Sequence, residues 1–265
     1  MITKKIGWIG CGNMGGAILH GALKSGVLAK ENAMVYDVSP AAMEKAEGWG
    51  VSLGADCADV CRNSDLILLA VKPQYAEQTL AQCQDALDGK AVISIVAGVT
   101  AERLRGMIKG CPRILRTMPN APAMVFEGAF ALCSDNDLTA DEMTAAEELF
   151  SSIGVVEQVP EKLIDAVCGL SGGGPAYAAM FIEAMADGGV KQGLPRATAY
   201  RLAAQTCLGT AKMILDMDIH PGQLKDMVTS PGGTTIEGCE MLEKGGMRGT
   251  VMACVNAATE KSKKL

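Results

Sequence analysis

The segment Ile6-Gly7-Trp8-Ile9-Gly10-Cys11-Gly12-Asn13-Met14-Gly15 decides the fold of this chain. Its apolar beginning predicts a strand over Lys5–Gly10, and an amphipathic helix is expected over Met14–Lys24. Between the two lies the pattern G-x-G-x-x-G. In a strand–turn–helix context this pattern is typical of a Rossmann dinucleotide-binding turn, whereas a plain glycine turn is the alternative.

Each glycine of the pattern has a separate physical role in such a turn. Gly10 permits the tight turn, Gly12 lets the backbone approach a pyrophosphate, and Gly15 lets the helix pack closely on the strand. The helix would begin at Asn13 and Met14, where unpaired N–H groups and the positive end of the helix dipole attract phosphate.

Apolar and amphipathic segments alternate through the first 160 residues and then give way to helical patterns alone. Strands are expected over Ala33–Asp37, Leu66–Val71, Ala91–Val96 and Arg113–Thr117, and helices over Pro40–Gly48, Ala76–Leu87 and Ala101–Ile108. Later helices are expected over Ile164–Cys168, Ala176–Gln192, Arg196–Met217, Pro221–Val228, Thr235–Lys244 and Thr250–Lys261. We therefore predict an α/β Rossmann N-terminal domain with a doubly wound sheet over 1–160, and an all-α C-terminal dimerisation domain over 161–265.

The helices of the second half are apolar on most of their circumference, as the segment around Met180, Ile182 and Met185 illustrates. Such helices must be buried. They could pack on the N-terminal domain alone, but a bundle of this size favours burial against a second copy of the chain. We therefore expect a homodimer.

Composition excludes several classes of protein. The net charge of −6 lacks the basic footprint of nucleic-acid binding. We find no secretory signal and no apolar stretch near the ~18–20 residues of a membrane span, so a cytoplasmic protein is expected. The ten cysteines are scattered without C-x-x-C and there are two histidines, so no metal site is expected.

The residues that follow the second strand bear on the choice of cofactor. Asp37 stands at the end of that strand, 22 residues past Gly15, where a carboxylate can bind the adenosine ribose diol and would repel a 2′-phosphate. Ser39 could donate to such a phosphate, and the loop has no arginine. We expect NADH to be the preferred cofactor, with NADPH tolerated.

Three further turns should lie at the same edge of the sheet, because each follows a predicted strand. Val71-Lys72-Pro73 could bring an ammonium group to a cofactor phosphate or expose it to solvent. Ala97-Gly98 is suited to shaping a nicotinamide pocket. Asn120, in Met118-Pro119-Asn120, is a candidate amide partner in that pocket or part of a structural turn.

Two glycine-rich segments in the helical half are expected to interrupt helices. One is Gly169–Tyr177 (GLSGGGPAY), at the start of the long helix. The other is Ser230–Thr235 (SPGGTT), which combines glycine freedom, hydroxyl groups and a helix N-terminus. The second segment could be a turn with a helix cap, but its composition favours a binding loop for a small carboxylate.

Five segments, in order along the chain, resemble pyrroline-5-carboxylate reductase over nearly the whole length. They are the glycine turn, V-K-P, M-P-N-A-P (118–122), S-G-G-G-P-A-Y (171–177) and H-P-G-Q-L-K-D-M-V-T-S-P-G-G-T-T-I (220–236). The resemblance implies reduction of 1-pyrroline-5-carboxylate to L-proline with NAD(P)H, the last step of proline biosynthesis. It also implies domain-swapped dimers that associate into rings, often decamers.

The same resemblance assigns residues. Thr235 matches the threonine that hydrogen-bonds the substrate ring nitrogen and is the catalytic candidate. The substrate carboxylate would be held by the loop that contains Ser230, Gly232, Gly233 and Thr234. In the swapped dimer, the partner chain would contribute this loop. This sequence departs from the family at Gly173, where serine is common, and Asp37 bears on the family's frequent NADPH preference.

Two other functions compete with this one. A β-hydroxyacid dehydrogenase would share the glycine spacing after Gly169, but Ala178 stands where its catalytic lysine should be and Ile182 where its asparagine should be. A non-catalytic NAD(H) sensor could use the same fold. The complete loops at 171–177 and 230–235 favour an enzyme, because a sensor needs no substrate pocket.

Overall fold

The computed structural model describes residues 1–264, which divide into two compact units. The sheet unit contains Met1–Gly173 together with the C-terminal segment from Ala257, and the helical unit contains Gly174–Asn256. Within these described residues, every helix falls short of the length or apolarity that crossing a bilayer demands.

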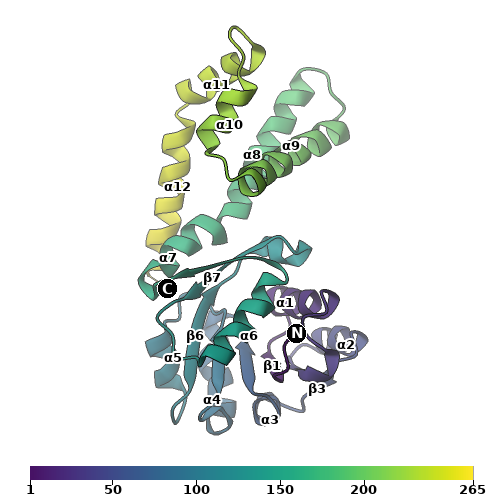
Figure 1. Cartoon of the computed structure of the whole chain (residues 1–265), viewed down its shortest axis with the longest axis vertical. Helices are drawn as coiled ribbons and strands as arrows, with labels where there is room; N and C mark the ends of the chain where they lie inside the picture. Colours follow the sequence, from purple (N-terminus) through teal and green to yellow (C-terminus); the bar gives the residue numbers. More distant parts are fainter. Residues whose placement is uncertain (265) are drawn as a thin grey trace. The chain divides into compact units, whose positions relative to one another are not determined.

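The sheet unit is built on eight strands in the order β3-β2-β1-β4-β5-β6-β7-β8 (Figure 1). The strands are β1 (Ile6–Ile9), β2 (Ala33–Tyr36), β3 (Ser52–Leu53), β4 (Leu66–Leu69), β5 (Ala91–Ser94), β6 (Arg113–Met118), β7 (Gly128–Cys133) and β8 (Gly154–Val159). All pairs from β3 to β6 are parallel. The predicted Rossmann sheet is therefore confirmed up to β6.

Beyond β6 the sheet departs from the expected alternation. Strand β7 runs antiparallel to β6, and β8 runs parallel to β7. The chain reverses through the 3₁₀ turn η4 (Ala121–Val125) and through Phe126, which adopts the left-handed conformation at φ 65°. The last two strands were not predicted because their pairing depends on this reversal and not on local periodicity.

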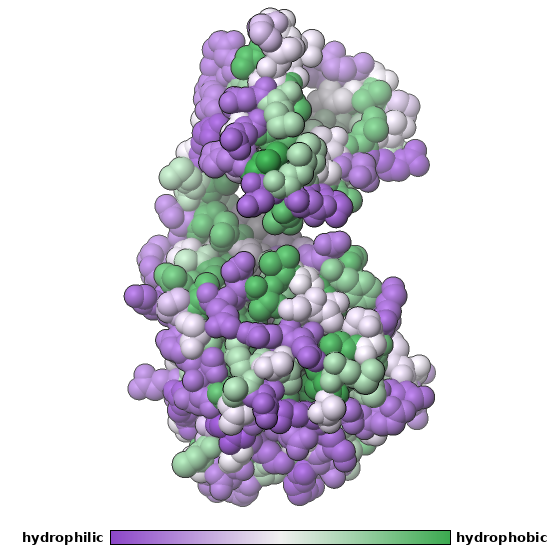
Figure 2. Space-filling view, in the orientation of Figure 1, coloured by the Kyte–Doolittle hydropathy of each residue, from purple (hydrophilic) through white to green (hydrophobic). Residues whose placement is uncertain are grey.

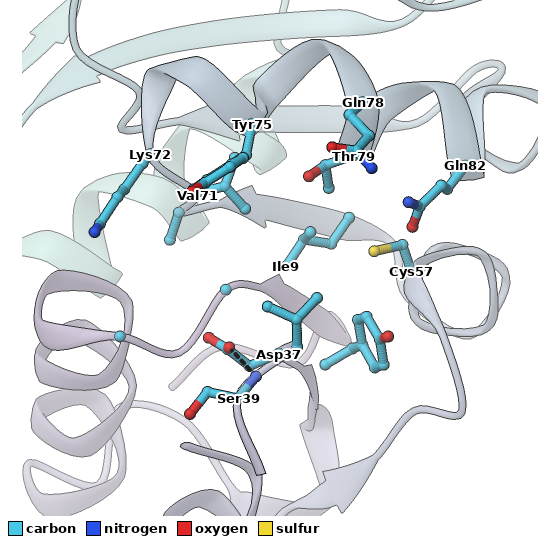
Figure 3. A pocket seen from close by; sticks show the side chains of 15 residues that line it. Ile9, Asp37, Ser39, Cys57, Val71, Lys72, Tyr75, Gln78, Thr79 and Gln82 are labelled. Atoms are coloured by element: carbon cyan, nitrogen blue, oxygen red, sulfur yellow. Dashed lines mark hydrogen bonds between the residues drawn. The ribbon is translucent and has the colours of Figure 1, made fainter. Parts of the chain in front are cut away.

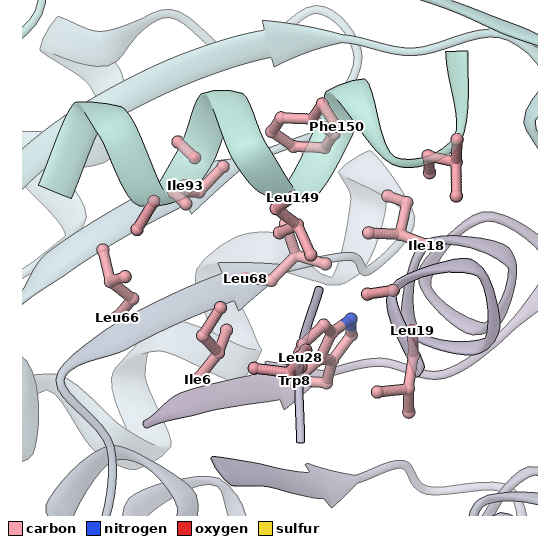
Figure 4. Close-up of a cluster of buried hydrophobic side chains, with 14 of the residues drawn as sticks. Ile6, Trp8, Ile18, Leu19, Leu28, Leu66, Leu68, Ile93, Leu149 and Phe150 are labelled. Carbon is pink, nitrogen blue, oxygen red and sulfur yellow. The ribbon is translucent and has the colours of Figure 1, made fainter. Parts of the chain in front are cut away.

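Helices cover both faces of the sheet. They are α1 (Asn13–Lys24), α2 (Pro40–Gly48), α3 (Cys57–Arg62), α4 (Ala76–Cys83), α5 (Ala101–Met107) and α6 (Ala140–Ser151). Successive residues of β4 belong to two different apolar clusters: Leu66 and Leu68 pack with α1 and α6 (Figure 4), whereas Ile67 and Leu69 pack with α3, α4 and α5. Burial on both faces explains why β4 reads as an unbroken apolar run.

The compact sheet unit extends past residue 160, to Gly173. Helix α7 (Ile164–Val167) packs on the sheet unit, since Ile164 is 1% exposed within the cluster that includes Leu68. The C-terminal end of α12 (Met247–Ser262) returns to the same unit, where the Ser262 hydroxyl donates to the Asp165 carboxylate at 2.7 Å. Packing therefore assigns both ends of the predicted helical domain to the sheet unit.

The glycine-rich segment 169–177 does not interrupt a helix, contrary to expectation. Residues Cys168–Gly172 form a turn of π-helix that leads directly into α8 (Gly174–Lys191). Glycine is required by packing here: a Cβ at Gly172 would lie 2.8 Å from Cε of Met118. Pro175 is the second residue of α8, directly after the π-helical turn.

The helical unit leaves much of its apolar surface exposed in a single chain. It consists of α8, α9 (Arg196–Met217), α10 (Pro221–Val228), α11 (Thr234–Lys244) and most of α12. Its buried cluster contains three alanines, Ala186, Ala199 and Ala203. Met180 on α8 is 70% exposed and Leu215 on α9 is 69% exposed, and Figure 2 shows apolar side chains on the visible surface of these helices. Exposed apolar area of this extent marks an interaction surface.

Candidate active site

A cavity of about 520 Å³ in the sheet unit lies at the carboxyl ends of β1, β2 and β4. Strand β1 pairs with β2 on one side and with β4 on the other, so this is the point where the strand order reverses. Open α/β sheets bind nucleotides at such a switch point. The lining residues are Ile9, Gly10, Gly12, Tyr36, Asp37, Val38, Ser39, Cys57, Ala70, Val71, Lys72, Tyr75, Gln78, Thr79 and Gln82 (Figure 3).

The glycine turn has the geometry that a pyrophosphate requires. Gly10 adopts φ 98°, and a Cβ there would lie 2.5 Å from the Ala70 carbonyl oxygen. A Cβ at Gly15 would lie 2.3 Å from the Gly10 oxygen, whereas a Cβ at Gly12 would meet no atom within 4 Å. Gly10 and Gly15 thus serve the packing of strand and helix, and Gly12 faces the open cavity.

Helix α1 presents its N-terminus to this turn. Gly12 is the N-cap and no side chain caps the helix. The N–H groups of Asn13 and Met14 lie in the first turn, where the helix itself offers no acceptor. A phosphate group fits this position, because it can accept those hydrogen bonds and is attracted by the helix dipole.

Asp37 and Ser39 lie on the wall of the cavity at the end of β2, as the sequence predicted for a ribose-binding position. The two oxygens of the Asp37 carboxylate accept hydrogen bonds from the N–H groups of Cys11, at 2.6 Å, and Ser39, at 2.8 Å. Because each carboxylate oxygen can accept more than one hydrogen bond, capacity remains for ribose hydroxyls.

The turn after β4 contributes Val71 and Lys72 to the cavity, while Pro73 begins the 3₁₀ turn η2 (Pro73–Tyr75). Among the described residues that line the cavity, Lys72 is the single lysine or arginine. Its side chain is exposed, and in Figure 3 it lies at the end of the cavity away from Cys57 and Gln82. Both predicted roles for Lys72, phosphate contact and solvent exposure, are compatible with this position.

Helix α4 forms a wall of the cavity that was not predicted from the sequence. Gln78, Thr79 and Gln82 line the cavity opposite Asp37 and Ser39 (Figure 3). Gln82 is a neighbour of Gln78 at spacing i, i+4 and of Thr79 at spacing i, i+3 on the helix surface, and this polar surface shortly after V-K-P was the available signal. Cys57, at the start of α3, lies beside Gln82 at the end of the cavity away from Lys72 (Figure 3), and burial is the main cause that raises the pKa of its thiol to about 12.

Ala97, Gly98 and Asn120 do not line this cavity. Ala97 and Gly98 follow β5, next to β4, with Gly98 at φ 73°. The side-chain oxygen of Asn120, which is 9% exposed, accepts a hydrogen bond from the N–H of Ala129 at 2.8 Å. This bond fastens the turn after β6 to β7, so a structural role for Asn120 is observed.

The second candidate loop lies in the helical unit, between α10 and α11. The Gly233 N–H donates to the Ser230 carbonyl at 3.0 Å, and Gly232 adopts φ 68°. With Pro231 in second position and Gly232 in third, this arrangement has the signature of a type II turn. The expected turn is therefore present, and its function as a binding loop stays a prediction.

Helix α11 starts at the end of this turn, with Gly233 as its N-cap and no side-chain cap. Thr234 and Thr235 occupy its first turn and both are exposed. Their hydroxyl groups and the adjacent N–H groups together can bind a carboxylate. Within residues 1–264, no group of three His, Cys, Asp or Glu side chains is arranged to hold a metal ion.

Family models match both halves of the chain. Residues 161–265 match "Pyrroline-5-carboxylate reductase dimerisation", and residues 5–98 match "NADP oxidoreductase coenzyme F420-dependent". The first match, together with the exposed apolar helices, supports self-association of this chain.

Full-length relatives agree with these matches. The chain is 45% identical to pyrroline-5-carboxylate reductase of Methanosarcina acetivorans and 42% identical to that of Escherichia coli, each comparison covering 100% of this chain and 99% of the relative.

Solved structures show the same similarity. The pyrroline-5-carboxylate reductase of Coxiella burnetii superposes with a TM-score of 0.94 at 33% identity, covering 99% of this chain and 98% of that one. A pyrroline carboxylate reductase of Plasmodium falciparum with NADP bound superposes with a TM-score of 0.88 at 35% identity, covering 100% and 98%. The chain belongs to the pyrroline-5-carboxylate reductase family of NAD(P)-dependent oxidoreductases.

Proposed function

We propose that this chain reduces 1-pyrroline-5-carboxylate to L-proline with NADPH or NADH, the last step of proline biosynthesis. The observation that carries the proposal is the nucleotide cavity at Gly12 and Asp37, in a chain that is 45% identical over its full length to a named pyrroline-5-carboxylate reductase. The preference for NADH over NADPH that Asp37 suggests is part of this proposal.

The residues of the chain supply binding and orientation. When bound, the reduced nicotinamide supplies a hydride to the carbon of the substrate C=N bond, while the ring nitrogen takes a proton from solvent or arrives protonated. The amides of Asn13 and Met14 hold the pyrophosphate. The amides and hydroxyls of Ser230–Thr234 hold the substrate carboxylate.

Thr235 is the proposed catalytic residue. Its hydroxyl hydrogen-bonds the ring nitrogen and so fixes the imine carbon relative to the hydride donor. This role requires neither a nucleophile nor a metal, because an iminium is already a strong electrophile. Residues Lys72, Ala97, Gly98 and Asn120 are proposed to shape the rest of the cofactor site.

We further propose a cytoplasmic homodimer that associates into a ring such as a decamer and that does not bind nucleic acid. The exposed side chains of Met180 and Leu215 support the dimer. The net charge of −6 speaks against binding to a phosphate backbone. The turn at Ser230–Gly233 would then serve the active site of the partner chain.

The direct test follows the loss of NADH or NADPH absorbance with 1-pyrroline-5-carboxylate. Wild type should turn over, and Thr235→Ala should lose roughly 100-fold or more in kcat/KM, the typical contribution of one well-placed hydrogen-bonding group. Thr235→Ser should recover part of the rate. Thr144→Ala is the matched control, because Thr144 lies on the surface of α6 with its hydroxyl bonded to the Ala140 carbonyl.

Each outcome separates the candidate functions. Turnover by wild type with a specific loss in Thr235→Ala supports the reductase. Binding of both cofactors without consumption of either would overturn the reductase and favour a non-catalytic NAD(H) sensor.

A further inference from the structure

The end of β2 is tied to the glycine-rich turn by two hydrogen bonds. The N–H of Gly10 donates to the Tyr36 carbonyl at 2.9 Å, and the N–H of Cys11 donates to the Asp37 carboxylate at 2.6 Å. The second carboxylate oxygen accepts from the N–H of Ser39 at 2.8 Å (Figure 3). One side chain therefore joins the turn that faces the pyrophosphate to the turn that faces the ribose.

These bonds determine which amides remain for a ligand. The Cys11 N–H is already used by Asp37, so the phosphate donors begin at Gly12 and continue through Asn13 and Met14. Gly12 directly follows Cys11, so the hydrogen bond from Cys11 to Asp37 also fixes the position of the Gly12 backbone that faces the cavity. Burial first, and the negative charge of Asp37 second, raise the pKa of the Cys11 thiol to about 11, which is consistent with a carboxylate held against this turn.

Cations do not compensate the Asp37 charge at close range. Among the described residues, no lysine or arginine nitrogen lies within 4.0 Å of the carboxylate, and its other close contacts are backbone N–H groups. A carboxylate can accept hydrogen bonds on both oxygens, whereas an asparagine amide would present a donor to one of the two N–H groups. The presence of an acceptor at both oxygens is therefore what allows one side chain to hold both turns at once.

We infer that Asp37 is a positioning residue that holds the glycine-rich turn in its cofactor-binding shape, in addition to facing the ribose. This inference deepens the proposed function, on which it rests. It differs from a role in cofactor selection alone: neutralising Asp37 should weaken binding of both dinucleotides, and a change to serine should not yield an efficient NADPH enzyme.

The first test measures dissociation constants by nicotinamide fluorescence, without substrate. Asp37→Asn should weaken NADH binding roughly 10- to 100-fold, the loss expected for a hydrogen bond to a charged group. NADPH should weaken less, because removal of the charge also eases repulsion of its 2′-phosphate. Asp37→Ser is the second variant, since its short side chain leaves space instead of a misplaced donor.

The decisive probe is an NADH analogue whose adenosine ribose lacks both hydroxyl groups. If Asp37 positions the turn, Asp37→Asn should still weaken binding of this analogue, although by less than it weakens NADH, because the ribose contact is already absent. An analogue that binds wild type and variant equally would overturn the inference and leave Asp37 with ribose contact alone.

Amide hydrogen exchange of the cofactor-free protein supplies an independent readout. The Cys11 amide should exchange at least about 10-fold faster in Asp37→Ser, because the shorter side chain takes the carboxylate acceptor away. Asp65→Ser is the matched control, since the Asp65 carboxylate accepts the Lys5 N–H at 2.9 Å, at the amino ends of β1 and β4. Unchanged protection of Cys11 would also overturn the inference.

Failure of this inference is distinguishable from failure of the proposed function. If wild type does not turn over 1-pyrroline-5-carboxylate, the proposed function fails, although the binding and exchange results still report on Asp37. If wild type turns over and Asp37→Asn binds the analogue normally, the inference alone fails.

Discussion

Adding one methyl group at Gly12 and at Gly15 should separate cofactor binding from folding. Gly12 has φ −66°, which alanine adopts, and a Cβ there meets no atom within 4 Å. Gly12→Ala should therefore leave the free energy of unfolding unchanged or raise it by about 0.4–1 kcal/mol. The added methyl would protrude into the cavity where we propose that the pyrophosphate binds and should cost about 1–3 kcal/mol of binding free energy, or roughly 5- to 150-fold in Kd.

Gly15→Ala should show the opposite pattern. Its Cβ would lie 2.3 Å from the Gly10 oxygen and 2.9 Å from Cβ of Ala70, so α1 must shift away from β1. We expect the free energy of unfolding to fall by about 1–3 kcal/mol, the usual cost of overpacking. Gly106→Ala on the exposed surface of α5 is the control, because a Cβ there also meets no atom within 4 Å.

Urea unfolding and NADPH binding by fluorescence measure the two effects. Normal NADPH affinity in Gly12→Ala would show that the pyrophosphate does not approach this backbone. Wild-type stability in Gly15→Ala would show that the contact between helix and strand adapts easily, and the packing argument for that glycine would fail.

Three further predictions concern stability and assembly. Glu142→Gln should lower the free energy of unfolding by about 2 kcal/mol at pH 7, because the Glu142 carboxylate pairs with Arg113 at 2.6 and 2.8 Å. Burial raises the pKa of Glu142, but the hydrogen bonds from Arg113 and the helix cap lower it more, to below its ordinary 4.5. The stabilisation should thus be complete well above pH 4.5 and disappear as pH falls through the lowered pKa. The urea unfolding curves of wild type and variant should therefore converge in acid. A difference in unfolding free energy that stays constant with pH would contradict this. Asn120→Ala should cost about 1–2 kcal/mol in urea unfolding by leaving the Ala129 N–H without its acceptor, and Asn120→Asp should recover stability. Met180→Asp should shift the sedimenting species towards the monomer, and an unchanged distribution would place Met180 outside the interface.

Much of the architecture follows from local signals along the chain. Strand β4 is apolar at every position because both of its faces are buried, and this pattern predicts a central parallel strand from sequence. The predicted bounds of α9 (Arg196–Met217) and α10 (Pro221–Val228) are confirmed. A proline marks the start of each helix: Pro195 is the N-cap residue of α9, and Pro221 is the first residue of α10. The role of Gly15 could be predicted because its Cβ would meet the nearby Gly10 oxygen, and the role of Gly10 because a tight turn requires its positive φ; the contact between Gly10 and Ala70 depends on the packed sheet.

Other features depend on partners that are distant in the sequence. The antiparallel strand β7 pairs with β6 only after the reversal at Phe126, and the glycines of Gly169–Gly174 read as a loop although they continue a helix packed against Met118. Periodicity describes which face of an element is apolar, but it does not say which other element covers that face.

The cofactor site shows the same division. The motif predicts the pyrophosphate at Gly12, because a phosphate can come close to the backbone only where the residue itself has no side chain. The polar wall at Gln78 and Gln82 and the link from Asp37 to Cys11 could not be read in this way. They arise because α4 and the end of β2 line the same cavity as the glycine turn. The hydrogen bond between Cys11 and Asp37, 26 residues apart, depends on the packed sheet that brings the two segments together.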